Sequence, residues 1–481
     1  MTTIKLDPGA ALLLDALHGA GHAAYAVGGC VRDSLLGLAP HDWDLCTSAR
    51  PEQVMALFGE EKCIPTGLQH GTVTVKQGGR LYETTTFRTE GAYSDGRHPD
   101  AVCFVPDVRE DLARRDFTIN AMAYSAEEGL IDPFGGRDDL AAHLVRAVGE
   151  PERRFEEDAL RILRLYRFAA RFGFAIDPAT GAAARALGPH LDCVSAERIQ
   201  EELLKLLAAP RPGSYLEPAV LAVVLPELEP EKQPERFAEL CRTIDRIEPT
   251  AENVPARLAA LLWPLGEAGA RKALRKLKCS NALTDEVTAL VGGSVGSFLL
   301  GHEFELRHPA DALCLERHSH PAGRCPNSNS LFPPQAAVVA VAGHSIARPI
   351  ACGNRVPPQR TVLGETPGTP NTTLTVQAKR LLGRYELPTI QRLTALCSAR
   401  RPEQAEALAA LRAEAERLTA ENACCRVSQL AVNGRDLMAV GVRPGPGLRQ
   451  GLNALLEAVI TGQTPNEKDA LLAAAAQFSA S

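Results

Sequence analysis

The first third of the chain alternates short apolar runs with glycine-rich turns. Residues 24–27 form an apolar run that ends at the glycine pair 28–29, and residues 30–36 then have helical spacing. Runs rich in Thr and Val flank a second glycine pair at 78–79, which predicts a β-hairpin. Short strands mixed with helices predict an α+β domain over residues 1–148.

From about residue 149 the pattern becomes helical. Residues 155–172 contain neither Pro nor Gly and are rich in Leu, Ala and Arg, which predicts one helix over this range. Another helix is expected to begin at Ser195 and to run through residue 207. We divide this part of the chain into two helical domains, 149–210 and 211–305.

Residues 306–375 interrupt the helical pattern. This stretch contains ten prolines and no sustained apolar period, which predicts an irregular insertion. Helical spacing resumes at 377–382 and is clear in 402–422, where Glu and Arg alternate with Ala and Leu. A helical domain is therefore expected over residues 376–481.

Composition and charge narrow the class of protein. Of the 481 residues, 45% are hydrophobic and 23% are charged, values typical of a folded globular protein. The absence of a long apolar run and of a secretory layout predicts a cytoplasmic protein with no membrane span. The thirteen cysteines form no C-x-x-C pair, which argues against a disulfide scaffold or a zinc ribbon. A net charge of −6 excludes an overall basic protein but not a local basic groove.

The first chemical signal is the turn at residues 28–29. A strand, a glycine pair and a helix start can form a phosphate cradle, because backbone N–H groups reach the oxygens and the helix N-terminus favours negative charge. Arg32 adds a charge that can reach a triphosphate. Taken alone, a glycine pair is more often a simple turn.

A pair of aspartates follows this turn. Asp42 and Asp44 precede or begin a short strand at 44–47, so alternation places both carboxylates on one face and Trp43 on the other. Mg²⁺ bound by one or two carboxylates together with substrate phosphates fits this arrangement. A solvated surface pair is the alternative. A metal phosphohydrolase of the His-Asp type would need further ligands that we do not find.

Two further blocks offer nucleotide contacts. Arg115 and Asp116 supply a phosphate donor and an acceptor for a ribose hydroxyl, although they could equally form a charged helix cap. Asp158 and Arg161 are one helical turn apart, where a carboxylate can accept from an exocyclic amine and a guanidinium can donate to ring acceptors. Such a pair would select C and A over U and G, whereas the simpler interpretation is a charged helix face.

These blocks, in this order, resemble the class II tRNA nucleotidyltransferase and bacterial poly(A) polymerase family, and the CCA-adding enzymes most closely. The resemblance covers residues 22–305 and 376–478. It rests on four motifs: Gly28-Gly29-x-x-Arg32-Asp33, Asp42-x-Asp44, Arg114-Arg115-Asp116-x-Thr118 and Glu157-Asp158-x-x-Arg161. It implies a polymerase-β-like nucleotidyltransferase head with a mixed sheet, followed by an all-helical neck, body and tail.

The resemblance also implies roles for individual residues. Asp42 and Asp44 match the catalytic metal carboxylates, and Glu83 is a candidate third carboxylate. The positions that match nucleotide contacts are Gly29, Arg32, Arg115, Asp116 near the ribose, Asp158 and Arg161 as the protein template, Arg164 and Arg167.

The implied activity is addition of CCA to the 3′ end of tRNA from CTP and ATP, with Mg²⁺ as cofactor and pyrophosphate as product. Residues 66–72 with 88–99 resemble the flexible loop of CCA-adding members, and residues 431–447 resemble their tail. A poly(A) polymerase, a partial CC- or A-adding enzyme, and an inactive RNA-binding protein remain alternatives. Either a monomer or a homodimer is compatible with the sequence.

A basic cluster follows in the predicted body. Arg271, Arg275 and Lys278 would share one face of a helix at i, i+4 and i+7. Phosphate contacts supply most nucleic-acid affinity, so we expect tRNA to bind this face, with a merely solvated face as the alternative.

Overall fold

The computed structural model describes residues 3–91, 102–293 and 373–479. The chain divides into two compact units. The first contains the described residues within 1–308 together with Arg384–Thr419, and the second contains those within 309–383 and from Ala420 onward. The predicted insertion at 306–375 falls almost wholly outside the described residues, as do residues 92–99 of the predicted loop. The domain boundaries drawn from the sequence stay predictions.

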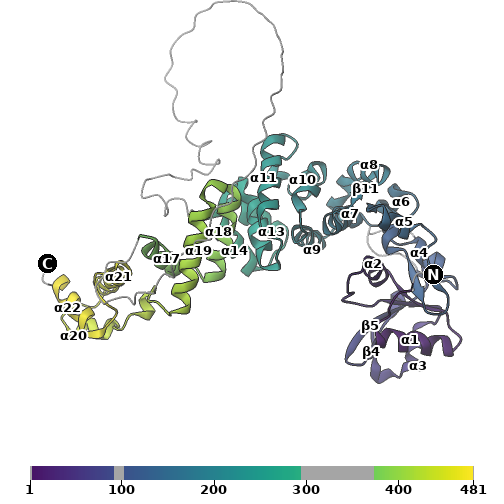
Figure 1. The fold of residues 1–481 in the computed structure, drawn as a ribbon, viewed down its shortest axis with the longest axis horizontal. Helices are drawn as coiled ribbons and strands as arrows, with labels where there is room; N and C mark the ends of the chain where they lie inside the picture. The colour runs from purple at the N-terminus through teal and green to yellow at the C-terminus, as the bar shows by residue number, and fades with distance from the viewer. Residues whose placement is uncertain (1–2, 92–101, 294–372, 480–481) are drawn as a thin grey trace, which may run out of the picture. The chain divides into compact units, whose positions relative to one another are not determined.

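A seven-stranded mixed sheet forms the N-terminal part of the first unit, with the strand order β3-β4-β5-β2-β1-β8-β9 (Figure 1). Its strands are β1 (Ala24–Val27), β2 (Leu45–Thr47), β3 (Cys63–Gly67), β4 (Thr72–Gln77), β5 (Arg80–Thr86), β8 (Ala123–Ser125) and β9 (Gly129–Ile131). β2 and β5 run parallel and the other neighbours run antiparallel. The α+β head with a mixed sheet expected from the sequence is thus confirmed.

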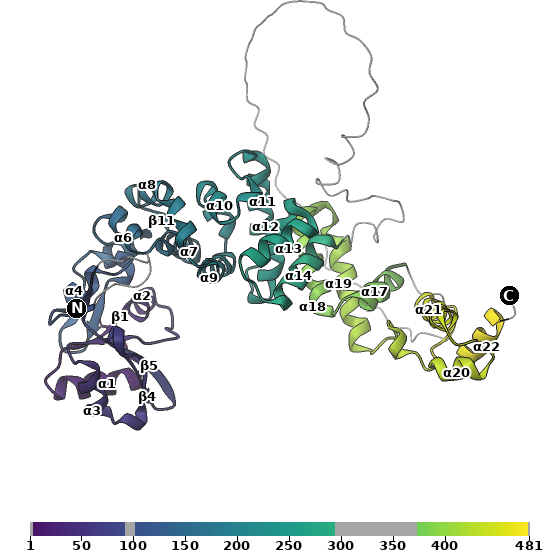
Figure 2. The same ribbon diagram turned by 180° about the vertical axis from the view of Figure 1, so that it is seen from behind.

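Helices cover both faces of this sheet. α1 (Pro8–Gly19) and α3 (Pro51–Phe58) lie side by side against one face (Figures 1 and 2). On the other face, α4 (Val108–Ala113) packs into a buried cluster that includes Tyr25, Val27 and Phe87. β1 is therefore buried on both faces, which explains why its sequence is an unbroken apolar run.

The local turns follow the sequence closely. β1 leads through Gly28 into α2 (Gly29–Leu35). The β4–β5 hairpin turns at Gly78 and Gly79, whose φ angles are +57° and +79°. Positive φ is strained for most residues with a side chain, so the glycine pair sets this turn. The predicted hairpin is confirmed.

Smaller elements complete the head. β6 (Arg88–Glu90) and β7 (Val102–Phe104) form an antiparallel ribbon. α5 (Gly136–Ala141) follows β9. β10 (Leu144–Val145) pairs in parallel with β11 (Ala175–Ile176), which lies beyond the first long helix of the neck.

The helix predicted over residues 155–172 is wrong as a single element. The structure has α6 (Pro151–Glu157) and α7 (Leu160–Phe172), separated at Asp158, whose backbone is extended with φ −148°. The Asp158 carboxylate accepts a hydrogen bond from the backbone N–H of Leu160 at 3.1 Å, so its side chain competes with the helical ladder. Without a Pro or Gly at the break, the sequence pattern could not show it.

The neck and body are helical, as expected. Their helices are α8 (Pro178–Ala186), α9 (Ala196–Leu207), α10 (Pro218–Val224), α11 (Pro234–Arg246), α12 (Val254–Leu262), α13 (Gly266–Lys276) and α14 (Asn281–Gly292). α9 begins directly after Ser195 and ends at Leu207, as predicted. α12 packs against α9, α11, α13 and α14, and also against α18 (Leu387–Arg400).

Arg257 of α12 is fully buried, with 0% of its side chain exposed. Its guanidinium donates to backbone carbonyl oxygens of Leu207 (2.7 Å) and Ala209 after α9, and of Ile247 (2.6 Å) after α11. A further bond reaches the carbonyl of Pro210. One side chain therefore satisfies the carbonyl groups left open where two helices end.

The second unit is also helical. Its helices are the greater part of α17 (Thr373–Arg384), α20 (Gly434–Ala439), α21 (Pro446–Thr461) and α22 (Lys468–Ser479), while α19 (Ala405–Ala420) ends at the boundary between the units. Leu437, Leu455 and Leu471 are buried in its core. None of the helices described in the chain is both long enough and apolar enough to cross a membrane.

Candidate active site

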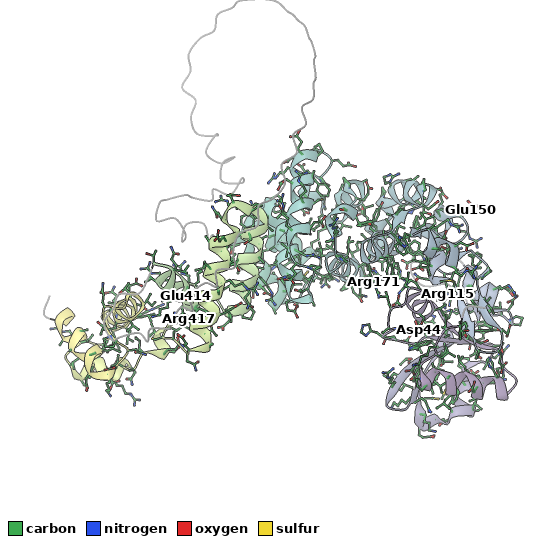
Figure 3. All side chains as sticks on the ribbon, in the orientation of Figure 1. Asp44, Arg115, Glu150, Arg171, Glu414 and Arg417 are labelled. Atoms are coloured by element: carbon green, nitrogen blue, oxygen red, sulfur yellow. The ribbon has the colours of Figure 1, made fainter. Side chains whose placement is uncertain are left out.

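A cavity of about 670 Å³ lies in the first unit, lined by residues of the head and the neck. All ten residues predicted for catalysis and nucleotide binding line it: Gly29, Arg32, Asp42, Asp44, Arg115, Asp116, Asp158, Arg161, Arg164 and Arg167. Figure 3 labels Asp44 and Arg115, which come from the head, and Arg171, which comes from α7. The structure thus brings together residues that are more than 100 positions apart in the chain.

The turn between β1 and α2 brings backbone close to a guanidinium. Gly28 has φ +75°, and a Cβ atom there would lie 2.8 Å from Nη1 of Arg115. Only glycine allows both the backbone angle and this close approach. Arg32, one turn into α2, is 4% exposed, and its guanidinium donates to Asn120 (2.5 Å) and Asp33 (2.8 Å). These bonds leave other guanidinium N–H groups for a ligand.

The two aspartates lie on the same side of the chain. Asp42 and Asp44 are exposed while Trp43 between them is buried, so the predicted alternation holds, although Asp44 precedes β2 rather than lying in it. β2 pairs with β5 so that Leu45 lies opposite Thr84, and Asp44 is therefore beside Glu83.

Negative charge is concentrated at this point. Partial burial by the surrounding protein, together with the charges of Glu83 and Asp42, raises the pKa of Asp44 to about 6. A cation would relieve this repulsion, and carboxylate oxygens are ligands that Mg²⁺ prefers. Among the described residues no group of three or more His, Cys, Asp or Glu side chains could hold a metal ion. Asp42 and Asp44 are oxygen donors, and Mg²⁺ is usually bound by one or two carboxylates together with substrate phosphates, so this donor set fits the ion.

Asp116 joins the head to the neck. It is 8% exposed, forms an ion pair with Arg164 of α7 at 2.6 Å, and accepts from the amide of Asn120 at 3.0 Å. Burial raises the pKa of Asp116, but the charge of Arg164 and the hydrogen bonds outweigh it and hold the pKa well below its usual value. Asp116 is therefore a fixed anion at the edge of the cavity.

Asp158 and Arg161 both line the cavity, but each has its own supporting contacts. The Asp158 carboxylate is held by both terminal nitrogens of Arg198 in α9, at 2.8 and 3.3 Å. Arg161 pairs with Glu157 at 2.8 Å and donates to the carbonyl of Arg114 at 3.1 Å. The two side chains are thus positioned from different elements.

Positive charge dominates the lining, with nine Arg or Lys side chains against four Asp. The sequence reasoning missed Arg171, Arg198, Lys205 and Phe168. Arg171 could have been found, since it continues the i, i+3, i+7 row begun by Arg164 and Arg167. Nothing in the local sequence marks Arg198, because its contact with Asp158 lies 40 positions away.

Three family matches cover separate parts of the chain. Residues 24–146 match the Poly A polymerase head domain. Residues 173–231 match the probable RNA and SrmB-binding site of polymerase A, and residues 382–475 match tRNA nucleotidyltransferase domain 2.

Known proteins give a consistent result. A CCA-adding enzyme of Leuconostoc citreum is 44% identical over 252 residues, which are 52% of this chain and 60% of that relative. One of Lactobacillus helveticus is 42% identical over 281 residues, which are 58% of this chain and 69% of that relative. The chain belongs to the CCA-adding enzyme family. The family expected from the sequence motifs is thereby confirmed.

Solved structures of the family extend the match to the whole chain. The Bacillus stearothermophilus CCA-adding enzyme in complex with CTP has a TM-score of 0.69 and 30% identity, and the match covers 99% of this chain and 98% of that one. A Thermotoga maritima CCA-adding enzyme, at 19% identity and a TM-score of 0.60, shares the fold. The fold of this chain is thus similar over nearly its whole length to that of a CCA-adding enzyme.

None of the three residues of the basic cluster predicted in the body lines the cavity. Arg271 pairs with Asp285 at 2.8 Å and Lys278 pairs with Glu197 at 2.7 Å, while Arg275 is exposed on α13. The prediction that all three share one helix face is wrong for Lys278. α13 ends at Lys276, and Lys278 has φ +54°, which turns the chain out of the helix.

Proposed function

We propose that this protein adds CCA to the 3′ end of tRNA without a nucleic-acid template, using CTP and ATP and releasing pyrophosphate. The observation that carries the proposal is one cavity lined by an acidic pair, a group of guanidiniums, and a separate carboxylate–guanidinium pair able to read a base. The curated relatives are named CCA-adding enzymes, and the Bacillus stearothermophilus structure was solved with CTP.

In this proposal the nucleotide is held mainly by its charged end. Arg32, Arg164 and Arg167 bind the triphosphate from two sides, since one comes from α2 and the others from α7. The N–H of Gly28 donates to the carbonyl of Met122, so the turn presents the backbone N–H of Gly29 to the ligand instead. Catalysis is then mostly positioning, so that the RNA 3′ hydroxyl attacks the α-phosphorus in line and pyrophosphate leaves.

Asp42 and Asp44 are proposed to hold Mg²⁺, with Glu83 beside them. The bound ion would lower the pKa of the attacking hydroxyl and neutralise charge on the leaving pyrophosphate. The two carboxylates keep this charge close to the phosphates that the arginines hold. The carboxylate of Asp116 accepts from the backbone N–H of Phe117, the amide of Asn120 and two nitrogens of Arg164. In this proposal a ribose hydroxyl binds Asp116 by displacing one of these donors.

Base selection follows from the groups left open on Asp158 and Arg161. A carboxylate has about four acceptor positions. Arg198 uses two of those on Asp158 and the N–H of Leu160 uses a third, so one remains for an exocyclic amine. Arg161 likewise keeps donors that its carbonyl and carboxylate partners do not occupy. Cytosine and adenine offer the matching amine and ring nitrogen, whereas uracil and guanine do not.

Asp158→Asn is therefore expected to weaken discrimination against UTP. An amide can donate to the uracil carbonyl, so we expect the preference for CTP over UTP to fall about 10- to 100-fold. Single-nucleotide incorporation with each nucleotide alone measures this ratio. Asp192→Asn, at an exposed site in the same neck, is the matched control. An unchanged ratio in Asp158→Asn would remove Asp158 from base selection.

The function itself is tested by extension. tRNA lacking its 3′ end is incubated with Mg²⁺ and each nucleotide singly and in mixture, and the products are sequenced. A product ending in CCA, with UTP and GTP refused, supports the proposal. Long A-tails would indicate a poly(A) polymerase, products ending in CC or A alone a partial enzyme, and no addition an RNA-binding protein.

We further propose that tRNA contacts α13 through Arg275. Its side chain is exposed and belongs to a basic helix, and phosphate contacts supply salt-dependent affinity. Arg275→Glu is expected to weaken tRNA binding and to reduce the salt slope by about one, while Lys62→Glu on the head is the control. Equal tRNA affinity in both variants would contradict this contact. The cytoplasmic location and the choice between monomer and homodimer stay predictions.

A further inference from the structure

One phenylalanine ring on α7 is in contact with three of the cavity's guanidinium groups. Phe168 lines the cavity and is 4% exposed. The guanidinium carbons of Arg167, Arg32 and Arg164 lie 4.0, 5.2 and 5.4 Å from the centre of its ring. These distances fall within the range of cation–π attraction. A single apolar side chain is thus the common neighbour of three positive charges.

A second ring extends the arrangement. Phe172, one turn further along α7, is parallel to Phe168 within 3°, with 6.3 Å between ring centres. It contacts Arg32 at 4.9 Å and Arg171 at 5.0 Å. Phe117 of the head packs edge-on against Phe168 at 5.8 Å. Phe168 is therefore held in place by aromatic neighbours from the head and from its own helix.

The four arginines have fewer anionic partners than positive charges. Arg32 and Arg171 share Asp33, at 2.6 and 3.2 Å. Arg164 pairs with Asp116. Arg167 pairs with Glu202 at 2.5 Å, and Arg164 also lies 3.8 Å from that carboxylate.

Four guanidiniums thus face three carboxylates in the described part of the chain. Their mutual repulsion would drive them apart or out into solvent. The negative face of an aromatic ring attracts cations without neutralising them, so it can hold them together while leaving their charge for a ligand. Additional carboxylates would hold them equally well but would cancel the charge.

We propose that Phe168 is a positioning residue for the triphosphate: its ring holds Arg32, Arg164 and Arg167 in the orientation that binds the nucleotide's phosphates. This inference rests on the proposed function, because it assigns the cluster to the nucleotide of that same site. Phe168 acts through the arginines and not through the base. Removal of the Phe168 ring should therefore lower the affinities for CTP, ATP and inorganic pyrophosphate by the same factor. Base selection by Asp158 and Arg161 should remain intact.

The test measures binding directly. Affinities of the full chain for CTP, ATP and pyrophosphate are determined by isothermal titration calorimetry in Phe168→Leu, which keeps an apolar side chain but removes the ring. We expect each affinity to fall about tenfold, equivalent to the loss of more than one cation–π contact. In the extension assay KM for both nucleotides should rise by a similar factor, with a smaller change in kcat.

Phe174→Leu is the matched control. Phe174 is also 4% exposed; it stacks on His143 at 5.0 Å and packs against Phe172 at 5.5 Å, but it does not line the cavity. The Phe174→Leu variant should lose a similar amount of apolar contact in the core, but its affinity for phosphate-bearing ligands should not fall. A double-mutant cycle with Arg167→Met adds a second readout: the effect of Phe168→Leu should shrink in that background, because the nearest guanidinium is already gone.

Three results would overturn the proposal. Wild-type affinities in Phe168→Leu would show that the ring is dispensable. Selective loss of one nucleotide would place Phe168 in base recognition, and equal losses in Phe168→Leu and Phe174→Leu would indicate general packing. If Phe168→Leu does not fold, Phe168→Met applies the same test. A wild-type protein that binds CTP but does not add CCA would instead contradict the proposed function and leave this inference standing.

Discussion

Asp44→Asn is expected to lower the rate of nucleotide addition by about 1,000-fold, because a metal site contributes several kcal/mol to stabilising the transition state. Asp44 lies beside Glu83 and shares a face with Asp42, and burial with these two charges raises its pKa to about 6. An amide in its place removes one ligand and part of the negative charge that attracts the cation. Single-turnover addition of CMP to tRNA under saturating Mg²⁺ measures the effect.

The control for this variant is Asp15→Asn, an exposed aspartate on α1 of the same head. It should retain wild-type activity. CTP binding without Mg²⁺ should change little in Asp44→Asn, since the arginines hold the phosphates. Full activity in Asp44→Asn would contradict the metal role, and a simple loss of folding would appear as a shifted thermal transition.

Arg257→Met is expected to destabilise the first unit by about 4 kcal/mol, the largest stability effect that we predict for one residue. Arg257 is completely buried and its guanidinium bonds to the carbonyl oxygens of Leu207, Ala209, Pro210 and Ile247. Methionine fills much of the volume but leaves these carbonyls without donors, and each buried unpaired group costs about 1–3 kcal/mol. Urea unfolding followed by circular dichroism gives the free energy.

Arg242→Met provides the comparison. Arg242 lies on the exposed side of α11 and pairs with Glu239 at 2.7 Å. Exposed pairs of this kind contribute about 0–1 kcal/mol. Similar unfolding free energies for the two variants would mean that the Arg257 hydrogen bonds add no stability beyond those made with water.

The local structure of the head was predictable because short-range rules determine it. The β4–β5 hairpin turns at two glycines with positive φ, and the apolar run of β1 is buried on both faces. The break between α6 and α7 was not predictable, because it results from the Asp158 side chain competing with the backbone ladder. The end of α13 before Lys278 is a similar case, since no glycine marks that turn.

The candidate site residues were predictable from motif resemblance and not from short-range rules. Motif resemblance named ten residues, and the structure places all ten around one cavity. The contacts that support them were missed. Arg198 holds Asp158 from α9, and Asn120 links Arg32 to Asp116 across the head. The contacts of Arg198 with Asp158 and of Asn120 with Arg32 are set by tertiary packing, so no spacing along the chain marks them.

The pairing of β10 with β11 has a consequence for how successive additions are made. It ties the end of the head to the segment that follows α7, while Asp116–Arg164 and Asp33–Arg171 attach the length of α7 to the head. Because these three contacts join α7 to the head, we expect α7 and the head to move together. We therefore expect the distance between the acidic pair and the base-reading residues to stay the same during successive additions. After each nucleotide is added, the 3′ end of the RNA would then have to move back relative to the site, because the distance between these two groups of residues does not change.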